Sequence, residues 1–220
     1  MTIAVTEVGA VNRGEGTQSD RLRAGNQGDL MVGNLHGPYY EQNQRGNLYQ
    51  WDSGADGITI LKYDNVNPAF VLWNKSTLYN LEIVEITVAW SGTPAVAGNI
   101  GYGMIIGAGS AIGTPISAFT ELATARKSKT FATANPPNGK CATTSTIAAL
   151  GAAAYKTLGF SIPGATAAAT TTAPGFTFIK PFRGDLIIKP GNAIAICGNV
   201  AQTAVMDFSI SWIDNAPYTV

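Results

Sequence analysis

Few side chains in this sequence of 220 residues could do chemistry, and they do not cluster. The one histidine, His36, cannot supply a two-histidine metal site, and no acidic residues gather around it. His36 lies in a polar, loop-like stretch, which is a poor place for a catalytic base, and no G-x-S-x-G serine motif occurs. We therefore expect His36 to be a loop or interface residue.

Carboxylate pairs could hydrolyse glycosides without histidine, and the sequence alone leaves this open. Glu82 and Glu85 lie three residues apart in an expected strand, so their side chains point to opposite faces. Asp52 and Asp56 lie in an expected loop, where carboxylates more often cap turns. The glycines of residues 101–109 lack the helix and lysine of a phosphate-binding loop. We expect no enzymatic activity, no cofactor and no metal ion.

The two cysteines, Cys141 and Cys197, are too few for a disulfide framework. Cys197 falls in an apolar segment with the pattern of a strand, where a buried free thiol is common. We therefore expect two free thiols. A single bridge would be possible in a protein that works outside a cell.

Charge is scarce and balanced in this chain. Charged residues make up 13% of it, and 14 basic residues match 14 acidic ones, whereas about 25% charged residues is usual. Such a low charge favours a surface that other subunits cover. We therefore expect a homo-oligomer, most readily a homotrimer. The alternative is a poorly soluble or secreted domain. Basic residues do not cluster, so nucleic acid is not an expected partner.

A membrane is not an expected partner either. No apolar run of the sequence approaches the ~20 residues that cross a bilayer. The first residues lack the basic flank of a signal peptide.

Alternation of apolar and polar residues predicts β-strands over much of the chain. Met206, Phe208, Ile210 and Trp212 are expected to face a core, with the small or charged residues between them outside. Residues 81–90 change phase near Val84, which predicts a β-bulge or a switch of the buried face. Further strands are expected at residues 58–60, 70–73, 100–106, 176–178, 186–188 and 193–197. This pattern predicts an all-β fold, a jelly-roll-like β-sandwich of eight or nine strands.

Two stretches depart from the alternating pattern. Residues 1–56 are rich in Gly, Asn, Gln and Arg, and we expect an extended N-terminal arm there, followed by the β-sandwich domain over residues 57–220. Residues 122–175 contain a long run dominated by Ala and Thr, and we expect an insertion between strands. Helical spacing of apolar residues predicts a short helix in the insertion, between Ile147 and Gly159.

The aromatic residues of the arm are too many for a solvated tail. Tyr and Trp are enriched at interfaces because they bury large areas. Stacking on sugar rings is an alternative for them, although sugar platforms usually stand on a rigid scaffold. We expect an interface with a partner or another subunit that is formed by Tyr39, Tyr40, Tyr49 and Trp51.

Several short motifs occur along the chain: Asp-Leu-Met-Val at residues 29–32, Leu-His-Gly-Pro-Tyr-Tyr-Glu at 35–41, Arg-Gly-Asn-Leu-Tyr at 45–49, Val-Leu-Trp-Asn at 71–74 and Lys-Pro-Gly at 189–191. Together they resemble capsid decoration, or cement, proteins of tailed bacteriophages. The resemblance implies an all-β virion protein, usually trimeric, that is made in the host cytoplasm and binds the major capsid protein on the capsid exterior. The Ala/Thr-rich insertion has no counterpart in the resemblance, and no catalytic residues carry over from it.

Other classes of protein fit the residues less well. The first alternative is a phage fibre or spike head domain that binds a host receptor or glycan. The copy number in the virion distinguishes such a domain from a capsid decoration protein. A small jelly-roll shell protein is disfavoured because the arm is not basic. A secreted carbohydrate-binding module is disfavoured because no signal peptide is recognised.

Overall fold

The computed structural model of the chain describes residues 39–54, 57–62, 66–90, 99–113, 115–122, 126–128, 136–143, 145–147, 155–163, 177–201 and 205–215. His36 and the predicted arm up to residue 38 lie outside the described residues. The unit that contains the strands extends from Glu41 to Val220. The fold is all-β apart from one short helix, α1 (Tyr40–Gln44).

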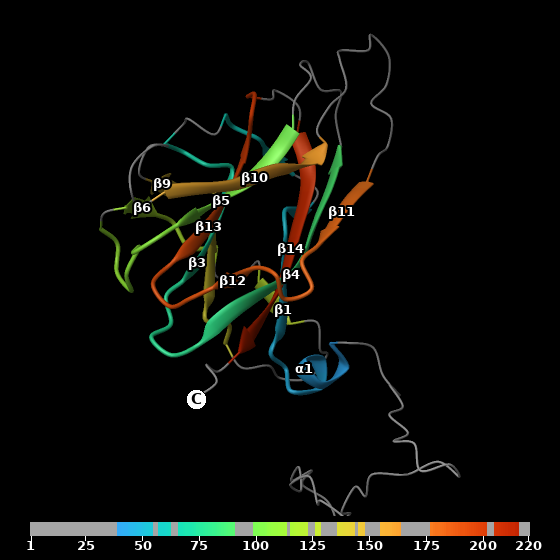
Figure 1. The fold of residues 1–220 in the computed structure, drawn as a ribbon, viewed down its shortest axis with the longest axis vertical. Helices are drawn as coiled ribbons and strands as arrows, with labels where there is room; N and C mark the ends of the chain where they lie inside the picture. Colours follow the sequence, from blue (N-terminus) through green and yellow to red (C-terminus); the bar gives the residue numbers. More distant parts are fainter. Residues whose placement is uncertain are drawn as a thin grey trace, which may run out of the picture. The chain divides into compact units, whose positions relative to one another are not determined.

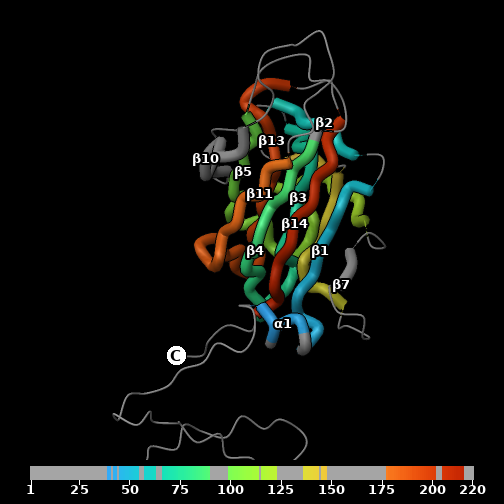
Figure 2. Tube along the Cα trace, turned by 90° about the vertical axis from the view of Figure 1, so that its right-hand side faces the viewer, coloured from blue at the N-terminus to red at the C-terminus, as the bar shows by residue number. Residues whose placement is uncertain are grey.

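Antiparallel sheets pack as a sandwich (Figure 1). The first sheet contains, in spatial order, β11 (Thr177–Pro181), β4 (Asn80–Trp90), β14 (Val205–Asn215), β1 (Leu48–Asp52) and β7 (Arg126–Ser128). Two short strands extend it, since β12 (Ile187–Ile188) pairs with β4 and β2 (Ile58–Thr59) pairs with β14. Figure 2 shows β11, β4, β14 and β1 side by side in this sheet.

The second sheet contains, in spatial order, β10 (Tyr155–Pro163), β5 (Asn99–Ile105), β13 (Ala193–Gly198), β3 (Phe70–Asn74) and β8 (Gly139–Ala142). A separate two-stranded sheet is formed by β6 (Ile116–Phe119) and β9 (Ser145–Ile147). In Figure 1 the β6–β9 pair lies on the side of the second sheet that faces away from the first.

The main core fills the space between the two large sheets. Its aromatic centre joins three strands, since the ring centroids of Trp51 and Phe70 lie 4.6 Å apart and those of Phe70 and Phe208 lie 5.2 Å apart. Such tilted aromatic pairs stabilise a core beyond the area that they bury. The sandwich is therefore held mainly by contacts between strands that are distant in sequence.

A second, smaller core lies beneath the β6–β9 pair. Trp73 of β3, Ala195 of β13 and Ile105 of β5 pack there against Ile116 and Ile147 of the small sheet. Because of this cover, every residue of β3 and of β13 is buried. A strand that is buried on both faces has a continuous apolar sequence rather than an alternating one. This explains why the sequences of β3 and β13 do not alternate.

Two strand predictions are confirmed for the apolar residues. Met206, Phe208, Ile210 and Trp212 are all buried, as the period of two in β14 requires, whereas Ser211, which was expected outside, is buried as well. The bulge in β4 lies at Val84, because Ser211 pairs with Glu85 while the next residue, Trp212, pairs with Ile83. The extra residue moves the buried positions of β4 into the other phase.

The predicted boundary of the arm at residue 56 is wrong. Residues 48–52 form β1, which pairs with β14 from Leu48 opposite Ile213 to Asp52 opposite Ser209. The Gly- and Asn-rich flanks hid a short alternating strand in which Tyr49 and Trp51 point into the core and Gln50 does not.

The predicted insertion is also corrected, because the described part of residues 122–175 contains four strands, β7 to β10. Two of them, β8 and β10, are the edge strands of the second sheet. The helix predicted between Ile147 and Gly159 is wrong over its described residues: Ile147 ends β9, and β10 begins at Tyr155. Pairing of β10 with β5 overrides the helical spacing of its apolar residues.

The two cysteines are not bridged, which confirms the prediction of free thiols. Cys141 lies in β8 and Cys197 in β13, and both side chains are buried.

A buried carboxylate closes one end of the main core. Asp214 accepts hydrogen bonds from the backbone N–H of Asn138 at 2.7 Å and from the Asn138 side-chain amide at 3.0 Å, and Trp212 Nε1–H donates to it at 3.1 Å. A buried charge needs such partners, because a carboxylate without them is strongly destabilising. Asp214 thus links the end of β14 to the start of β8.

Two tryptophans provide a matched test of this network. Trp212→Phe should destabilise the fold by about 1–3 kcal/mol more than Trp51→Phe, because Trp212 loses a hydrogen bond to a buried carboxylate. The buried Trp51 Nε1 has no acceptor among the described residues, and the two changes remove the same atoms. Urea unfolding followed by circular dichroism measures both variants. Equal losses would show that the Trp212–Asp214 bond contributes nothing to stability.

Candidate interaction surface

The structure divides the four aromatic residues that the sequence analysis placed at an interface. Tyr49 is 2% exposed and Trp51 is 3% exposed, and both belong to the main core. Tyr49 stacks on Trp212, with their ring centroids 5.9 Å apart. The interface prediction is therefore wrong for these two residues, which already bury their rings within the sandwich. Tyr39 is half-buried and Tyr40 is 40% exposed.

The position of Tyr49 has an electrostatic consequence. Burial, and secondarily the negative charge of Asp214, raise the pKa of Tyr49 from 10.0 to about 12. The tyrosinate is thus disfavoured in the folded state. Tyr49 therefore contributes stability that is fully present below about pH 10 and is lost as the pH rises towards 12.

This pH dependence should disappear in Tyr49→Phe. Between about pH 10 and 12 the free energy of unfolding should fall more steeply in the wild type than in this variant. Tyr79→Phe, which changes an exposed tyrosine, should keep the wild-type slope. Urea titrations at a series of pH values measure the slopes, and parallel curves for all three proteins would contradict the raised pKa.

One end of the sandwich gathers three connections that are far apart in the sequence: residues 75–79 between β3 and β4, residues 106–115 between β5 and β6, and residues 189–192 between β12 and β13 (Figure 1). Hydrogen bonds join the second connection directly to the third, and Asn74 at the end of β3 links the first connection to the third, so the three are ordered together rather than independent loops.

Asn74 is the centre of these hydrogen bonds. Its side-chain amide, which is fully buried, donates to Tyr79 O and to Ile188 O, both at 2.8 Å. Its Oδ1 accepts from Ser76 N at 3.1 Å, and its backbone N–H donates to Asn192 O at 2.9 Å. One side chain thus fixes the turn after β3 and ties that turn to the end of β12.

Trp73 and Asn192 hold the connection between β5 and β6 in place. Trp73 Nε1–H donates to Gly109 O at 2.9 Å, and Gly107 N–H donates to Asn192 Oδ1 at 2.9 Å. Gly109 N–H donates to Gly191 O at 2.9 Å. Gly191 has φ +73, a left-handed conformation that favours glycine, so a side chain there would strain this turn.

Large apolar side chains point to solvent at this end. Leu78 is 64% exposed, and four other side chains on or beside the three connections are also exposed. We call the five residues the loop-end surface: Leu78, Tyr79, Ile106, Ile112 and Ile187. Exposed apolar groups that gather on an ordered scaffold mark sites of protein contact.

The charge at this end is positive. Lys75 and Lys189 are the only charged residues in residues 75–79, 106–113 and 189–192. The Lys75 ammonium lies 5.1 Å from the centre of the Trp73 ring, a cation–π contact. The loop-end surface therefore suits a partner that is apolar with an acidic margin.

Sequence reasoning missed the loop-end surface because the sequence Asn74-Lys75-Ser76 is typical of a turn and shows nothing more. The available signal was Leu78-Tyr79, two large apolar residues within a polar turn. Such residues must either be buried or contact a partner. The contact from Asn74 to Ile188, by contrast, joins residues 114 positions apart and leaves no local pattern.

The described residues offer little else that could define a site. No three of their His, Cys, Asp and Glu side chains come close enough to hold a metal ion. Within the same residues no helix has the length and apolar character needed to cross a bilayer. No protein-family model, curated protein or solved structure matches the chain. The functional argument therefore depends on the chain's own surfaces.

Asn74→Ala tests whether one side chain orders the loop-end surface. The change should leave the buried carbonyl group of Ile188 and the partly buried one of Tyr79 without their donor and destabilise the protein by about 2–3 kcal/mol. It should also speed hydrogen exchange at the amide of Gly191, which donates to Asn74 O. Asn99→Ala, at an exposed asparagine at the start of β5, serves as the control. Unchanged exchange at Gly191 would mean that the loops are ordered without Asn74.

Proposed function

We propose that the sandwich is a jelly roll. Eight strands support this description: β1, β4, β11 and β14 in the first sheet and β3, β5, β10 and β13 in the second. Along the chain these strands alternate between the two sheets, except that β5 and β10 pair with each other. Two Greek keys rolled together would give this alternation, and such domains occur in viral capsids and lectins.

We further propose that the chain is a structural protein of a tailed-bacteriophage virion. It binds the outer surface of the capsid, stabilises contacts between capsomers, and has no enzymatic activity or cofactor. The observation that carries the proposal is the loop-end surface, five exposed apolar side chains on connections that are hydrogen-bonded together. The resemblance of the sequence motifs to capsid decoration proteins and the net charge of zero support it.

The proposed mechanism is burial of apolar surface against the major capsid protein. Burial of one exposed Leu or Ile side chain stabilises a contact by about 1.5–3 kcal/mol before the entropy of ordering is subtracted. Because Asn74 already orders the loops, little of this energy would be lost on binding. Each copy would then oppose the separation of neighbouring capsomers when packaged DNA pushes outwards.

The oligomeric state is part of the proposal. The low charge of the chain favours a surface that other subunits cover. In the structure, β6 and β9 cover much of the outer face of the second sheet within the same chain. A homotrimer on the capsid therefore rests on the low charge and on the resemblance.

Capsid binding should depend on the loop-end surface. The double variant Leu78→Ser/Ile112→Ser should bind at least about tenfold more weakly to phage capsids assembled without this protein, because two apolar contacts are lost. Cosedimentation of purified protein with these capsids measures the affinity.

The control is Ile179→Ser, which removes an isoleucine that is 62% exposed on β11, away from the three connections. It should bind like the wild type. Wild-type affinity in the double variant would exclude the loop-end surface as the interface. If the wild-type protein does not bind capsids at all, the proposed role on the capsid is wrong.

A further inference from the structure

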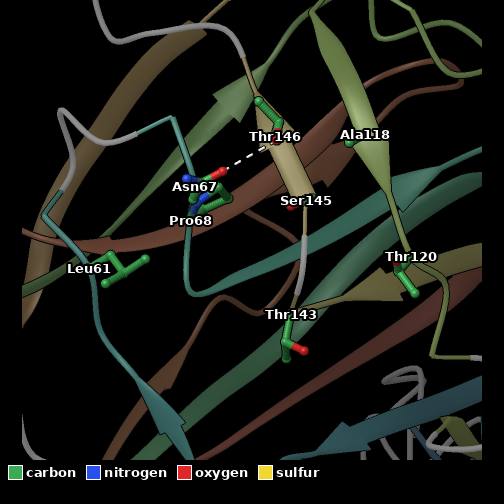
Figure 3. A pocket seen from close by; sticks show the side chains of 8 residues that line it. All are labelled: Leu61, Asn67, Pro68, Ala118, Thr120, Thr143, Ser145 and Thr146. Carbon is green, nitrogen blue, oxygen red and sulfur yellow. Dashed lines mark hydrogen bonds between the residues drawn. The ribbon is translucent and has the colours of Figure 1, made fainter.

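A hollow of about 160 Å³ opens between the β6–β9 pair and the segment that joins β2 to β3 (Figure 3). Its polar lining comes from both sides: Asn67 precedes β3, Thr120 follows β6, and Thr143, Ser145 and Thr146 lie in or just before β9. Asn67 and Thr120 are exposed, so the hollow opens to solvent. It is separate from the loop-end surface, with which it shares no residue.

Ser145 gives this hollow an unsatisfied hydrogen-bonding group. Its side chain is 3% exposed, and its Oγ has no hydrogen-bond partner among the described residues. Burial of a hydroxyl without a partner costs about 1–3 kcal/mol. Native proteins rarely retain this cost unless a water molecule or a ligand satisfies the group.

The other polar groups are held in place by the fold. Thr146 Oγ1–H donates to Asn67 Oδ1 at 3.3 Å, which joins the two sides of the hollow (Figure 3). Ile147 N–H donates to Val66 O at 2.8 Å and fixes β9 against the same segment. A site whose walls are fixed in this way needs little reorganisation to bind a ligand.

The chemistry of the lining selects the class of ligand. The lining holds four hydroxyl groups and one amide, and it contains no charged side chain, so neither an anion nor a cation is favoured. Its apolar part, formed by Leu61, Pro68 and Ala118, suits the C–H face of a ring. The volume corresponds to about five water molecules. This is enough room for one small ring but not for a chain of several rings.

We propose that this hollow binds one neutral, hydroxyl-bearing ring, such as a single sugar unit. Hydroxyl groups of the ring bond to Ser145 and to the threonines of the lining, and the apolar residues contact its C–H groups. The site goes beyond the proposed capsid role, because it would let a copy on the virion contact surface glycans without using the loop-end surface.

Ligand-observed NMR on the full chain tests the proposal. The probes are D-glucose, D-galactose, D-mannose and N-acetyl-D-glucosamine, each titrated separately, with tetrahydropyran as a ring that lacks hydroxyl groups. At least one sugar should give a saturable signal, and tetrahydropyran should give none. If none of the four sugars saturates, the hollow holds only water and the proposal is wrong.

Substitutions locate the binding. Ser145→Ala and Thr120→Val should each weaken binding of that sugar, Ser145→Ala by about tenfold because one hydrogen bond is lost. Ser110→Ala changes an exposed serine outside the lining and should have no effect. Without sugar, Ser145→Ala should not lower the thermal midpoint, since the hydroxyl has no partner within the described residues.

The outcome is independent of the capsid role. If Ser145→Ala does not fold, Thr120→Val, at an exposed position, decides the result. Sugar affinity that is unchanged in the folded variants would place the binding elsewhere and overturn the proposal. Both variants should still bind capsids, so failure of sugar binding and failure of capsid binding can be told apart.

Discussion

Burial of the second sheet on both faces is the constraint on which the rest of the structure depends. Main-core residues such as Phe70 and Ile194 face the first sheet, whereas Trp73 and Ala195 face the other way. The second face is covered by β6 and β9, which belong to the long connection between β5 and β10. Without this cover, an apolar face of Val71, Trp73, Ala193 and Ala195 would be left in water.

The same connection builds both surfaces to which we assign binding. Its first part, residues 106–115, contributes Ile106 and Ile112 to the loop-end surface and is held by Trp73 and Asn192. Its later part contributes Ser145 and Thr146 to the hollow. A segment that completes the core thus also presents functional side chains on a rigid support, which is how loops commonly carry function.

Order at the loop end is what separates an interaction surface from ordinary exposed apolar residues. Single exposed apolar side chains are normal on a protein surface. Here Asn74 satisfies one carbonyl group from the turn after β3 and one from the end of β12, and Gly191 takes the positive φ that its turn requires. The result is an apolar surface with little conformational entropy left to lose on binding.

How much of this could be predicted from the sequence depends on whether the cause is local. The buried apolar residues of β14 and the bulge at Val84 follow from the period of two within one strand, and both predictions are confirmed, although Ser211 is buried against expectation. β1 was missed because its five residues lie between polar, glycine-rich flanks, so Tyr49 and Trp51 were assigned to a partner instead of to the core. Pairing of β10 with β5 has no local signal, and Gly159 interrupts its alternation.

The candidate sites were less predictable than the fold for the same reason. The loop-end surface depends on a hydrogen bond from Asn74 to Ile188, and the hollow depends on one from Thr146 to Asn67. Each bond joins residues that only the finished fold brings together. The residue types alone, an asparagine after a strand or a threonine in an Ala/Thr-rich run, are common in loops of every function.

A cryo-EM reconstruction of the virion that carries this protein tests the central proposal most directly. The account predicts density for the β-sandwich at hundreds of symmetry-related positions on the outside of the capsid, with Leu78 and Ile112 against the major capsid protein. Density confined to a few copies on the tail or fibres, or a capsid-bound sandwich whose loop-end surface faces solvent, would contradict it.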